Sequence, residues 1–205
     1  MQKNRNPIRY IGRKTANFLS EFGEISRLLE RTFSFVPRIG RDRILLLKQM
    51  EHIGSNSIPL VIIIGFFTGM VSAWQAASQF KGLISLSLLG SAVSRAIFME
   101  LGPVLTAIVI AGRVGASIAA ELGTMKVTEQ IDALESLGIS PARYLSTPRV
   151  LAGTLMLPIL TIFANIIALF GAFVVANFFL GISEKVFFDS VKRFFHLKDV
   201  FGGLF

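Results

Sequence analysis

The segment "IPLVIIIGFFTGMVSAWQAASQF", residues 58–80, contains no charged side chain, and no Asp, Glu, Lys or Arg lies between Glu51 and Lys81. At ~1.5 Å of rise per residue, a helix of this length crosses a hydrocarbon core of ~30 Å. Four small residues recur at every fourth position and therefore share one helix face: Gly65, Gly69, Ala73 and Ala77. Because small residues let helix backbones approach closely in lipid, the segment predicts a first membrane span with a second helix packed against that face.

The composition of the whole chain is typical of a membrane protein, since 52% of its 205 residues are hydrophobic and 17% are charged. The absence of cysteine excludes disulfides and thiolate metal sites. His52 and His196 are too far apart in the sequence to suggest a ligand pair, so we expect no metal site. The net charge of +8 does not indicate a nucleic-acid partner, because Lys and Arg are concentrated before residue 50 among spaced apolar residues, a pattern that fits a membrane surface.

Residues 1–50 are predicted to form interfacial helices that lead into the first span. Apolar side chains recur at helical spacing over 8–35, with charged residues on the other faces, which indicates an amphipathic helix in the membrane interface. A soluble helix packed on a partner protein is the alternative. Pro37 and Gly40 interrupt the pattern before a second helix begins over 44–50. No apolar run long enough to span precedes the first span, so we expect no cleavable signal peptide.

Two further spans are predicted, over 96–120 and 148–180, which makes an all-α integral membrane protein. The second span contains Glu100 near one end and Arg113 towards the other, ~20 Å apart on roughly opposite faces, so these two cannot pair. The helix-packing residues predicted on the first two spans are Gly65, Gly69, Ala111, Gly112, Gly115 and Ala119. The third span carries a similar row: Ala164, Ala168, Ala172 and Ala176. Three spans with small-residue faces indicate a tightly packed bundle.

The distribution of basic residues predicts a cytoplasmic N-terminus. This orientation places eleven Lys and Arg before residue 50 on the inside, together with Arg113, Lys126, Arg143 and Arg149. The outside then receives six: Lys81, Arg95, Lys185, Lys192, Arg193 and Lys198. The segment 121–147 between the second and third spans is therefore expected in the cytoplasm, and the amphipathic segment 183–205 on the outside.

The cytoplasmic segment 121–147 is predicted to contain a short, rigid helix. Apolar residues at spacings of four, three and three share one face: Val127, Ile131, Leu134 and Leu137. Acidic residues lie largely away from that face: Glu129, Asp132 and Glu135. Gly138 suits the end of this helix, and Ser140 with Pro141 begins the next one. The apolar face must dock either on the cytoplasmic ends of its own bundle or in a groove of another protein.

A rigid helix between two spans can transmit force, because a displacement of the helix moves both attached spans. The sequence contains no G-x-x-x-x-G-K-[ST] phosphate loop, metal cluster or Ser/His/Asp set, so we expect no catalytic residue and no cofactor in this chain. An external motor protein would supply the energy.

The run "MELGPVLTAIVIAGRVGASIAAELGTMKVTEQIDALESLGISPARYLSTPRVLAG", residues 99–153, resembles the signature region of the MlaE-type permease family. These permeases are the membrane subunits of ABC transporters that move phospholipids and related lipids. The motifs E-L-G-P-V-L, G-R-V-G-A-S, A-E-L-G-T-M and E-Q-I-D-A-L-E occur in order without a gap. The amphipathic start and the first span also look similar, so the resemblance covers nearly the whole chain.

The resemblance implies a homodimeric permease of the bacterial inner membrane that exchanges lipids between the inner and outer membranes or envelope layers. Two cytoplasmic ATPase subunits, which use ATP and Mg²⁺, would engage the segment around 129–137 as a coupling helix. Family members also cooperate with MCE-domain proteins that form lipid conduits and, in many Gram-negative bacteria, with a small STAS-domain subunit. They carry two more spans after a periplasmic amphipathic segment, so residues 1–205 are expected to be a single permease domain that is C-terminally incomplete.

Two hypotheses concern the charged residues of the second span. Glu100, with Leu101 and Pro103, is predicted to line a lipid entry cavity near its outer end, because intramembrane carboxylates usually face a bundle interior or a wet cavity. An interfacial glutamate bonded to a neighbouring helix is the alternative. Arg113 is predicted to be a structural charge that pairs with a carboxylate such as Glu121 or Glu129; binding to lipid phosphate is the alternative.

The residues predicted to couple the permease to its ATPase are Val127, Glu129, Ile131, Asp132, Leu134, Glu135 and Leu137. A solvated helix face is the alternative for the three acidic members. Two other functions stay open: an ion-coupled carrier or channel that uses Glu100, and a membrane scaffold that recruits cytoplasmic partners through 121–145. Both are less consistent with the family resemblance than a lipid permease.

Overall fold

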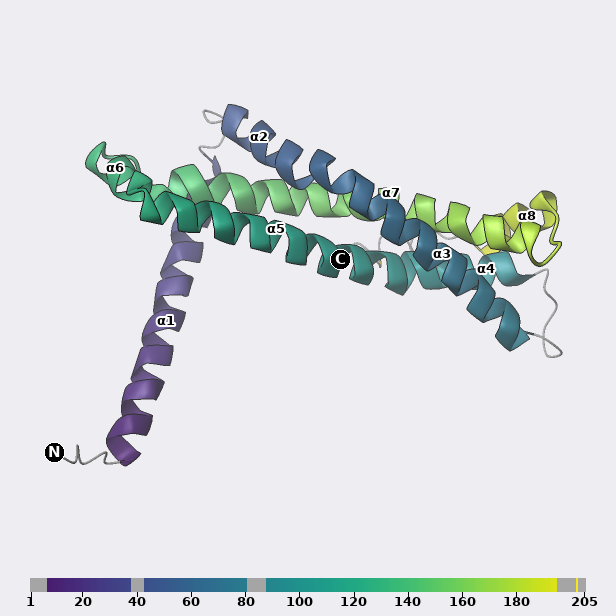
Figure 1. Cartoon of the computed structure of the whole chain (residues 1–205), viewed down its shortest axis with the longest axis horizontal. Coiled ribbons are helices and arrows are strands. Elements are labelled where there is room, and N and C mark those ends of the chain that lie inside the picture. The colour runs from purple at the N-terminus through teal and green to yellow at the C-terminus, as the bar shows by residue number, and fades with distance from the viewer. Residues whose placement is uncertain (1–6, 38–42, 81–87, 195–201, 203–205) are drawn as a thin grey trace.

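A computed structural model of the chain describes residues 7–37, 43–80, 88–194 and 202, with side chains from residue 13. This part of the chain is helical and contains no strand, which confirms the all-α class (Figure 1). Three helical units are long and apolar enough to cross a membrane, as expected: Arg43–Phe80, Leu89–Val127 and Ala142–Phe178. Features of the sequence at Gly40, Lys81, His196 and Lys198, the side chains of 7–12, and most of the segment after Phe194 lie outside the described residues.

Each unit is built from consecutive helical segments. The first comprises α2 (Arg43–Ile53), the 3₁₀ turn η2 (Ser55–Ser57) and α3 (Ile58–Phe80). The second comprises α4 (Leu89–Ala96), the π-helical turn η4 (Ile97–Leu101) and α5 (Gly102–Val127). The third comprises the π-helical turn η5 (Ala142–Ser146) and α7 (Thr147–Phe178). Pro103 and Pro148 lie in the first turns of α5 and α7, each directly after a π-helical turn.

The centre of the bundle is the crossing of α3 over α7, visible in Figure 1. The four small residues predicted to share a face of α3 are all buried, and so are the four alanines of α7. A Cβ atom on Gly65 would lie 3.0 Å from the carbonyl oxygen of Ala164, and one on Gly69 would overlap the carbonyl oxygen of Ala168. The expected second helix against the first span is therefore α7, at backbone contact distance.

The opposite end of the bundle from α2 is closed by α8 (Glu184–Phe194), which packs on α4. Phe187 is 1% exposed in the apolar cluster that joins these helices to α3 and α7. The Ser91 backbone N–H donates to the Ser190 hydroxyl at 3.0 Å, and Gly90 leaves room for the Phe187 backbone. The amphipathic face of α8 is thus used within this chain.

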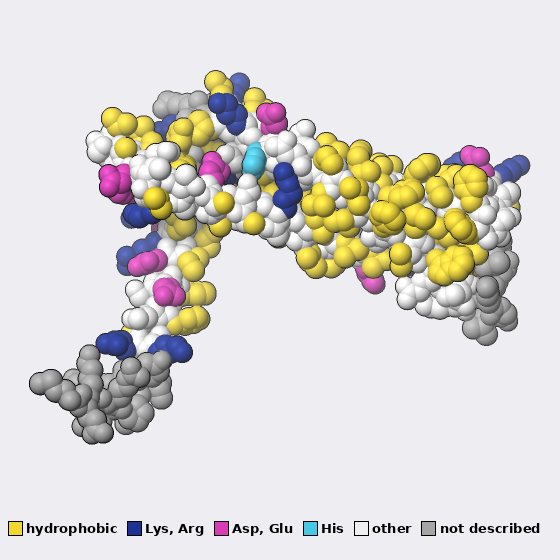
Figure 2. Space-filling view, viewed as in Figure 1, with side chains coloured by type: hydrophobic (Ala, Val, Ile, Leu, Met, Phe, Trp, Pro, Cys, Tyr) yellow, Lys and Arg dark blue, Asp and Glu magenta, His cyan; other side chains and the backbone are white. Residues whose placement is uncertain are grey.

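The amphipathic helix α1 (Pro7–Phe35) projects steeply from the end of the bundle that carries α6 (Gln130–Ser136) (Figure 1). Its apolar side chains are exposed: Phe18, Leu19, Phe22, Ile25 and Phe33. Figure 2 shows them on the side of α1 that faces the apolar belt of the bundle, with charged side chains on the other side. This arrangement suits a helix that lies flat in the interface while the bundle crosses the membrane.

Candidate functional site

The turn between α5 and α7 differs from the single rigid helix expected there. Helix α5 continues to Val127, and Glu129 then adopts a left-handed conformation with φ of 57° before the seven-residue helix α6 begins. The Thr128 hydroxyl donates to the Thr124 carbonyl at 2.8 Å, and the Thr128 backbone N–H donates to the same carbonyl at 3.0 Å. The prediction of one helix over 127–137 is therefore wrong, because α5 ends inside it.

The end of α6 agrees with the sequence. Gly138 has φ of 73°, its N–H donates to the Glu135 carbonyl at 2.9 Å, and the Ile139 N–H donates to the Leu134 carbonyl at 2.9 Å. This pair of bonds is a Schellman motif, in which a glycine takes the left-handed position after the helix. The two chain reversals place α6 as a short projection at the tip of the bundle (Figure 1).

The predicted coupling residues are distributed over the surface of this projection. The three acidic side chains, Glu129, Asp132 and Glu135, are exposed, and Asp132 pairs with Lys126 at 3.7 Å across the break. On the apolar side, Ile131 and Leu134 are half-buried. Two further apolar members remain uncovered in this chain, Val127 (84% exposed) and Leu137 (74% exposed). Only part of the expected apolar face therefore docks on the chain's own bundle.

An ion pair beneath the turn was missed by the sequence reasoning. Arg149 Nη2 lies 2.8 Å from Glu121 Oε2, and the Arg149 side chain is 6% exposed. The pair joins the end of α5 to the first turn of α7, the two helices that flank α6. Counting Arg149 only as a basic residue near a span hid its role; its position directly after the helix-starting Pro148 was the available signal.

Arg113 does not pair with Glu121 or Glu129, so the predicted carboxylate partner is wrong. Its Nη1 donates to the Ser57 hydroxyl at 2.6 Å, and that hydroxyl donates to the Ile53 carbonyl. A second polar contact lies one helical turn further along α5, where His52 Nε2 is 3.0 Å from Ser117 Oγ. Because Glu121 lies two helical turns along α5, ~12 Å away, Arg113 instead ties α5 to the junction of α2 and α3.

The residues predicted to line a lipid cavity are not brought together in this chain. Leu101 lines a narrow apolar crevice between α3, α5 and α7, which also includes Leu105 and Val61. Glu100 and Pro103 are not among the lining residues, and Glu100 is exposed. A cavity around Glu100 would need surface that the described residues of one chain do not supply, so its cavity role stays a prediction.

The small residues of α5 also differ from the predicted packing. The row is exposed: Ala111, Gly112, Gly115 and Ala119. A Cβ added to Gly112 or Gly115 would meet nothing within 4 Å, in contrast to Gly69 on α3. Within the part of the chain that the structure describes, this face of α5 has no helix packed on it.

Comparison with known proteins gives consistent matches. Residues 46–205 match the family model described as Permease MlaE. The chain is 44% identical over 159 residues to a probable ABC transporter permease protein of Synechocystis sp., covering 78% of this chain and 60% of that protein. It is 36% identical over 194 residues to a probable ABC transporter permease protein of Rickettsia felis, covering 95% of this chain and 75% of that protein. It is 32% identical over 188 residues to the intermembrane phospholipid transport system permease protein MlaE of Haemophilus influenzae, covering 92% and 72%.

Proposed function

Because the chain belongs to the MlaE permease family, we propose that it is the membrane subunit of an ABC transporter that moves phospholipids between the inner membrane and the outer envelope. The observation that carries the proposal is the family match over 46–205, which contains all three spans and the α5–α6 turn. Since the chain spans 60% of the length of its Synechocystis relative, the activity proposed is that of the whole protein.

In this proposal α6 is the coupling element that two cytoplasmic ATPase subunits engage while they bind and hydrolyse ATP with Mg²⁺. The exposed acidic side chains, together with Val127 and Leu137, offer charged and apolar contacts on one projection. The ion pair between Glu121 and Arg149 fastens α5 to α7 directly beneath it. A force on α6 would therefore move both spans as a unit and not simply bend the turn.

Further parts of the proposal concern assembly and location. A second copy of the chain would complete the lipid cavity around Glu100, and the exposed small-residue face of α5 is a suitable contact surface for it. An MCE-domain protein, and in some systems a STAS-domain subunit, would complete the complex. The bacterial inner membrane with a cytoplasmic N-terminus is the proposed location, supported by the name of the Haemophilus relative and by the basic residues before residue 50.

The test is to purify the full-length protein in mild detergent and identify the proteins and lipids that accompany it by mass spectrometry. Stoichiometric ATPase and MCE-domain subunits with bound phospholipid are expected. Reconstituted complex should then move phospholipid only when ATP is hydrolysed. A stable preparation without an ATPase, whose transport follows an ion gradient or is absent, would contradict the proposal and support the carrier or the scaffold.

A further inference from the structure

A polar pocket lies between α2, α5 and the start of α7, below the turn that carries α6. Its polar lining residues are Lys48, Gln49, Glu121, Thr124, Gln130, Tyr144 and Arg149. The apolar side chains of Ile44 and Leu45 also border it, and Ile44 is 70% exposed. The pocket is therefore open to the surroundings and combines charged groups with an apolar rim.

The pocket contains buried hydrogen-bonding groups that the chain leaves unused. Arg149 is nine-tenths buried, and one nitrogen of its guanidinium, Nη2, binds Glu121. Its Nε and Nη1 donors have no hydrogen-bond partner among the described residues. Buried donors without acceptors are costly, so a group that brings acceptor oxygens into this pocket would be stabilised.

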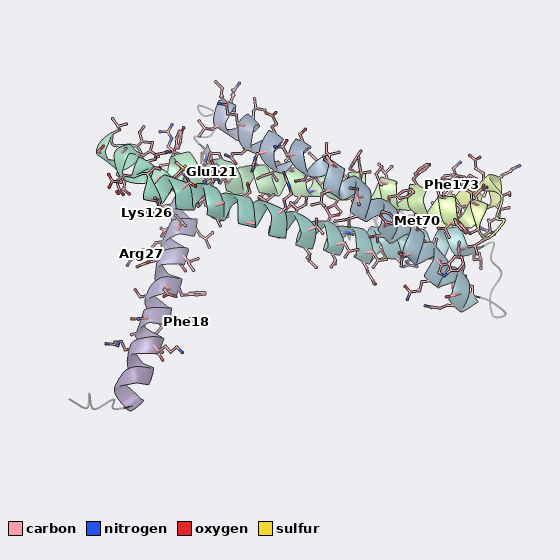
Figure 3. All side chains as sticks on the ribbon, viewed as in Figure 1. Phe18, Arg27, Met70, Glu121, Lys126 and Phe173 are labelled. Carbon is pink, nitrogen blue, oxygen red and sulfur yellow. The ribbon has the colours of Figure 1, made fainter. Side chains whose placement is uncertain are left out.

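The position of α1 indicates how deep in the membrane the pocket lies. The Thr147 hydroxyl donates to the Thr32 carbonyl at 3.3 Å, which fixes the end of α1 beside the first residue of α7. Figure 3 shows Glu121 on α5 near the point where α1 meets the bundle, with Lys126 beyond it towards α6. Arg149 is two residues after Thr147, ~3 Å along the helix axis. If α1 lies in the interface, the pocket is at the depth of lipid headgroups.

We propose that this pocket binds the phosphate of a phospholipid headgroup in the membrane leaflet on the α1 side. A phosphodiester carries negative charge and several acceptor oxygens on one centre, so it can accept hydrogen bonds from Arg149 and from Lys48 together. Glu121 offsets only one of these two positive charges. Acyl chains of the same lipid would lie along the apolar rim at Ile44. The inference does not depend on ATP-driven transport, because a chain with another function would bind the headgroup equally well.

The test uses photo-crosslinking from within the pocket of the delipidated full-length protein in a phosphate-free detergent. Tyr144, which is 41% exposed and lines the pocket, is replaced by p-benzoylphenylalanine. The probes are dioleoylphosphatidylglycerol, dioleoylglycerol with the same acyl chains but no phosphate, and inorganic phosphate as a competitor. We expect crosslinking to the phospholipid alone, without displacement by inorganic phosphate.

Three substitutions locate the binding groups. Lys48→Gln removes an exposed cation, and Arg149→Lys keeps the charge beside Glu121 but removes the unused guanidinium donors. Each should weaken phospholipid binding about tenfold, the effect of losing one charge-assisted hydrogen bond. Lys126→Gln, an equal charge change on the exposed end of α5 outside the pocket, should have no effect. If Arg149→Lys does not fold, Lys48→Gln carries the test alone, because Lys48 is exposed and its replacement should leave the melting temperature at the parent value.

Three outcomes would overturn the proposal. Equal crosslinking in the parent and in the Lys48 and Arg149 variants would show that these groups do not bind the lipid. Equal crosslinking to dioleoylglycerol would show that the phosphate is not recognised. Displacement by inorganic phosphate would identify a soluble phosphate as the occupant in place of a lipid.

Discussion

Gly69 is the residue at which the packing of two spans depends on the absence of a side chain. A Cβ atom there would overlap the Ala168 carbonyl oxygen, and backbone atoms cannot move aside as a flexible side chain can. Gly69→Ala should therefore separate α3 from α7 and destabilise the protein by about 1–3 kcal/mol. The measurement is thermal unfolding of the purified protein in detergent.

The matched control is Gly153→Ala on α7, where an added Cβ meets nothing within 4 Å. This variant should be at least as stable as the parent, because a methyl group there causes no clash and alanine favours a helix more than glycine does. If both variants melted at the parent temperature, the close approach of α3 and α7 at Gly69 would be incorrect.

Single residues also show where sequence reasoning stops. The small residues of α3 were predictable, because their period of four places them on one face whatever the partner is. The partners of charged residues were not predictable in the same way. Arg113 reaches Ser57 and Glu121 reaches Arg149 because the packing of α5 between the other helices decides which side chains meet. No periodicity within one helix contains that information.

At the scale of elements, the end of α6 at Gly138 was predictable from the sequence, whereas the break between α5 and α6 at Glu129 was not. Gly138 after an apolar face signals a helix end, and the structure has a Schellman motif there. Glu129 gave no such signal, since a non-glycine residue seldom adopts positive φ. The helical spacing of apolar residues continues past Glu129 in the sequence. The left-handed conformation is required only because the chain changes direction there, from α5 to α6.

The exposed acidic side of α6 leads to a prediction about the ATPase. Asp132→Lys reverses a charge that is 61% exposed and breaks only a surface pair with Lys126, so the fold should be retained. If the ATPase binds α6, the amount of ATPase that copurifies should fall several-fold, because the variant loses the contacts of the Asp132 carboxylate and its new lysine repels basic groups of the ATPase. The control is Glu24→Lys on the exposed charged side of α1. Full retention of the ATPase by the Asp132 variant would exclude this contact.

The uncovered face of α5 leads to a second prediction at the element scale. Gly115→Leu places a large side chain where the described chain has empty space, so a single copy should fold and melt as the parent does. If a second copy packs on this face, the side chain should weaken the dimer and lower lipid transport together. Size-exclusion chromatography with light scattering measures the dimer. An intact dimer in the variant would place the contact elsewhere on the molecule.

At the scale of the whole molecule, the two ends of the bundle differ in the elements that they carry. The end with α6 also holds α1, whose apolar side faces the apolar belt, whereas α4 and α8 close the other end (Figures 1 and 2). A membrane around that belt separates α6 from α8. The positive-inside rule then predicts that α6 and the basic residues before residue 50 lie in the cytoplasm.

This orientation can be measured with single cysteines, because residues 1–205 contain none and an introduced thiol is the only maleimide target among them. Ser136→Cys marks the end of α6 and Ser183→Cys marks the segment before α8, and both positions are exposed. In spheroplasts, a membrane-impermeant maleimide should label Ser183→Cys at once. It should label Ser136→Cys only after the membrane is permeabilised. The reverse pattern would place α6 outside, where no cytoplasmic ATPase could reach it, and would remove the basis for a transporter coupled through that helix.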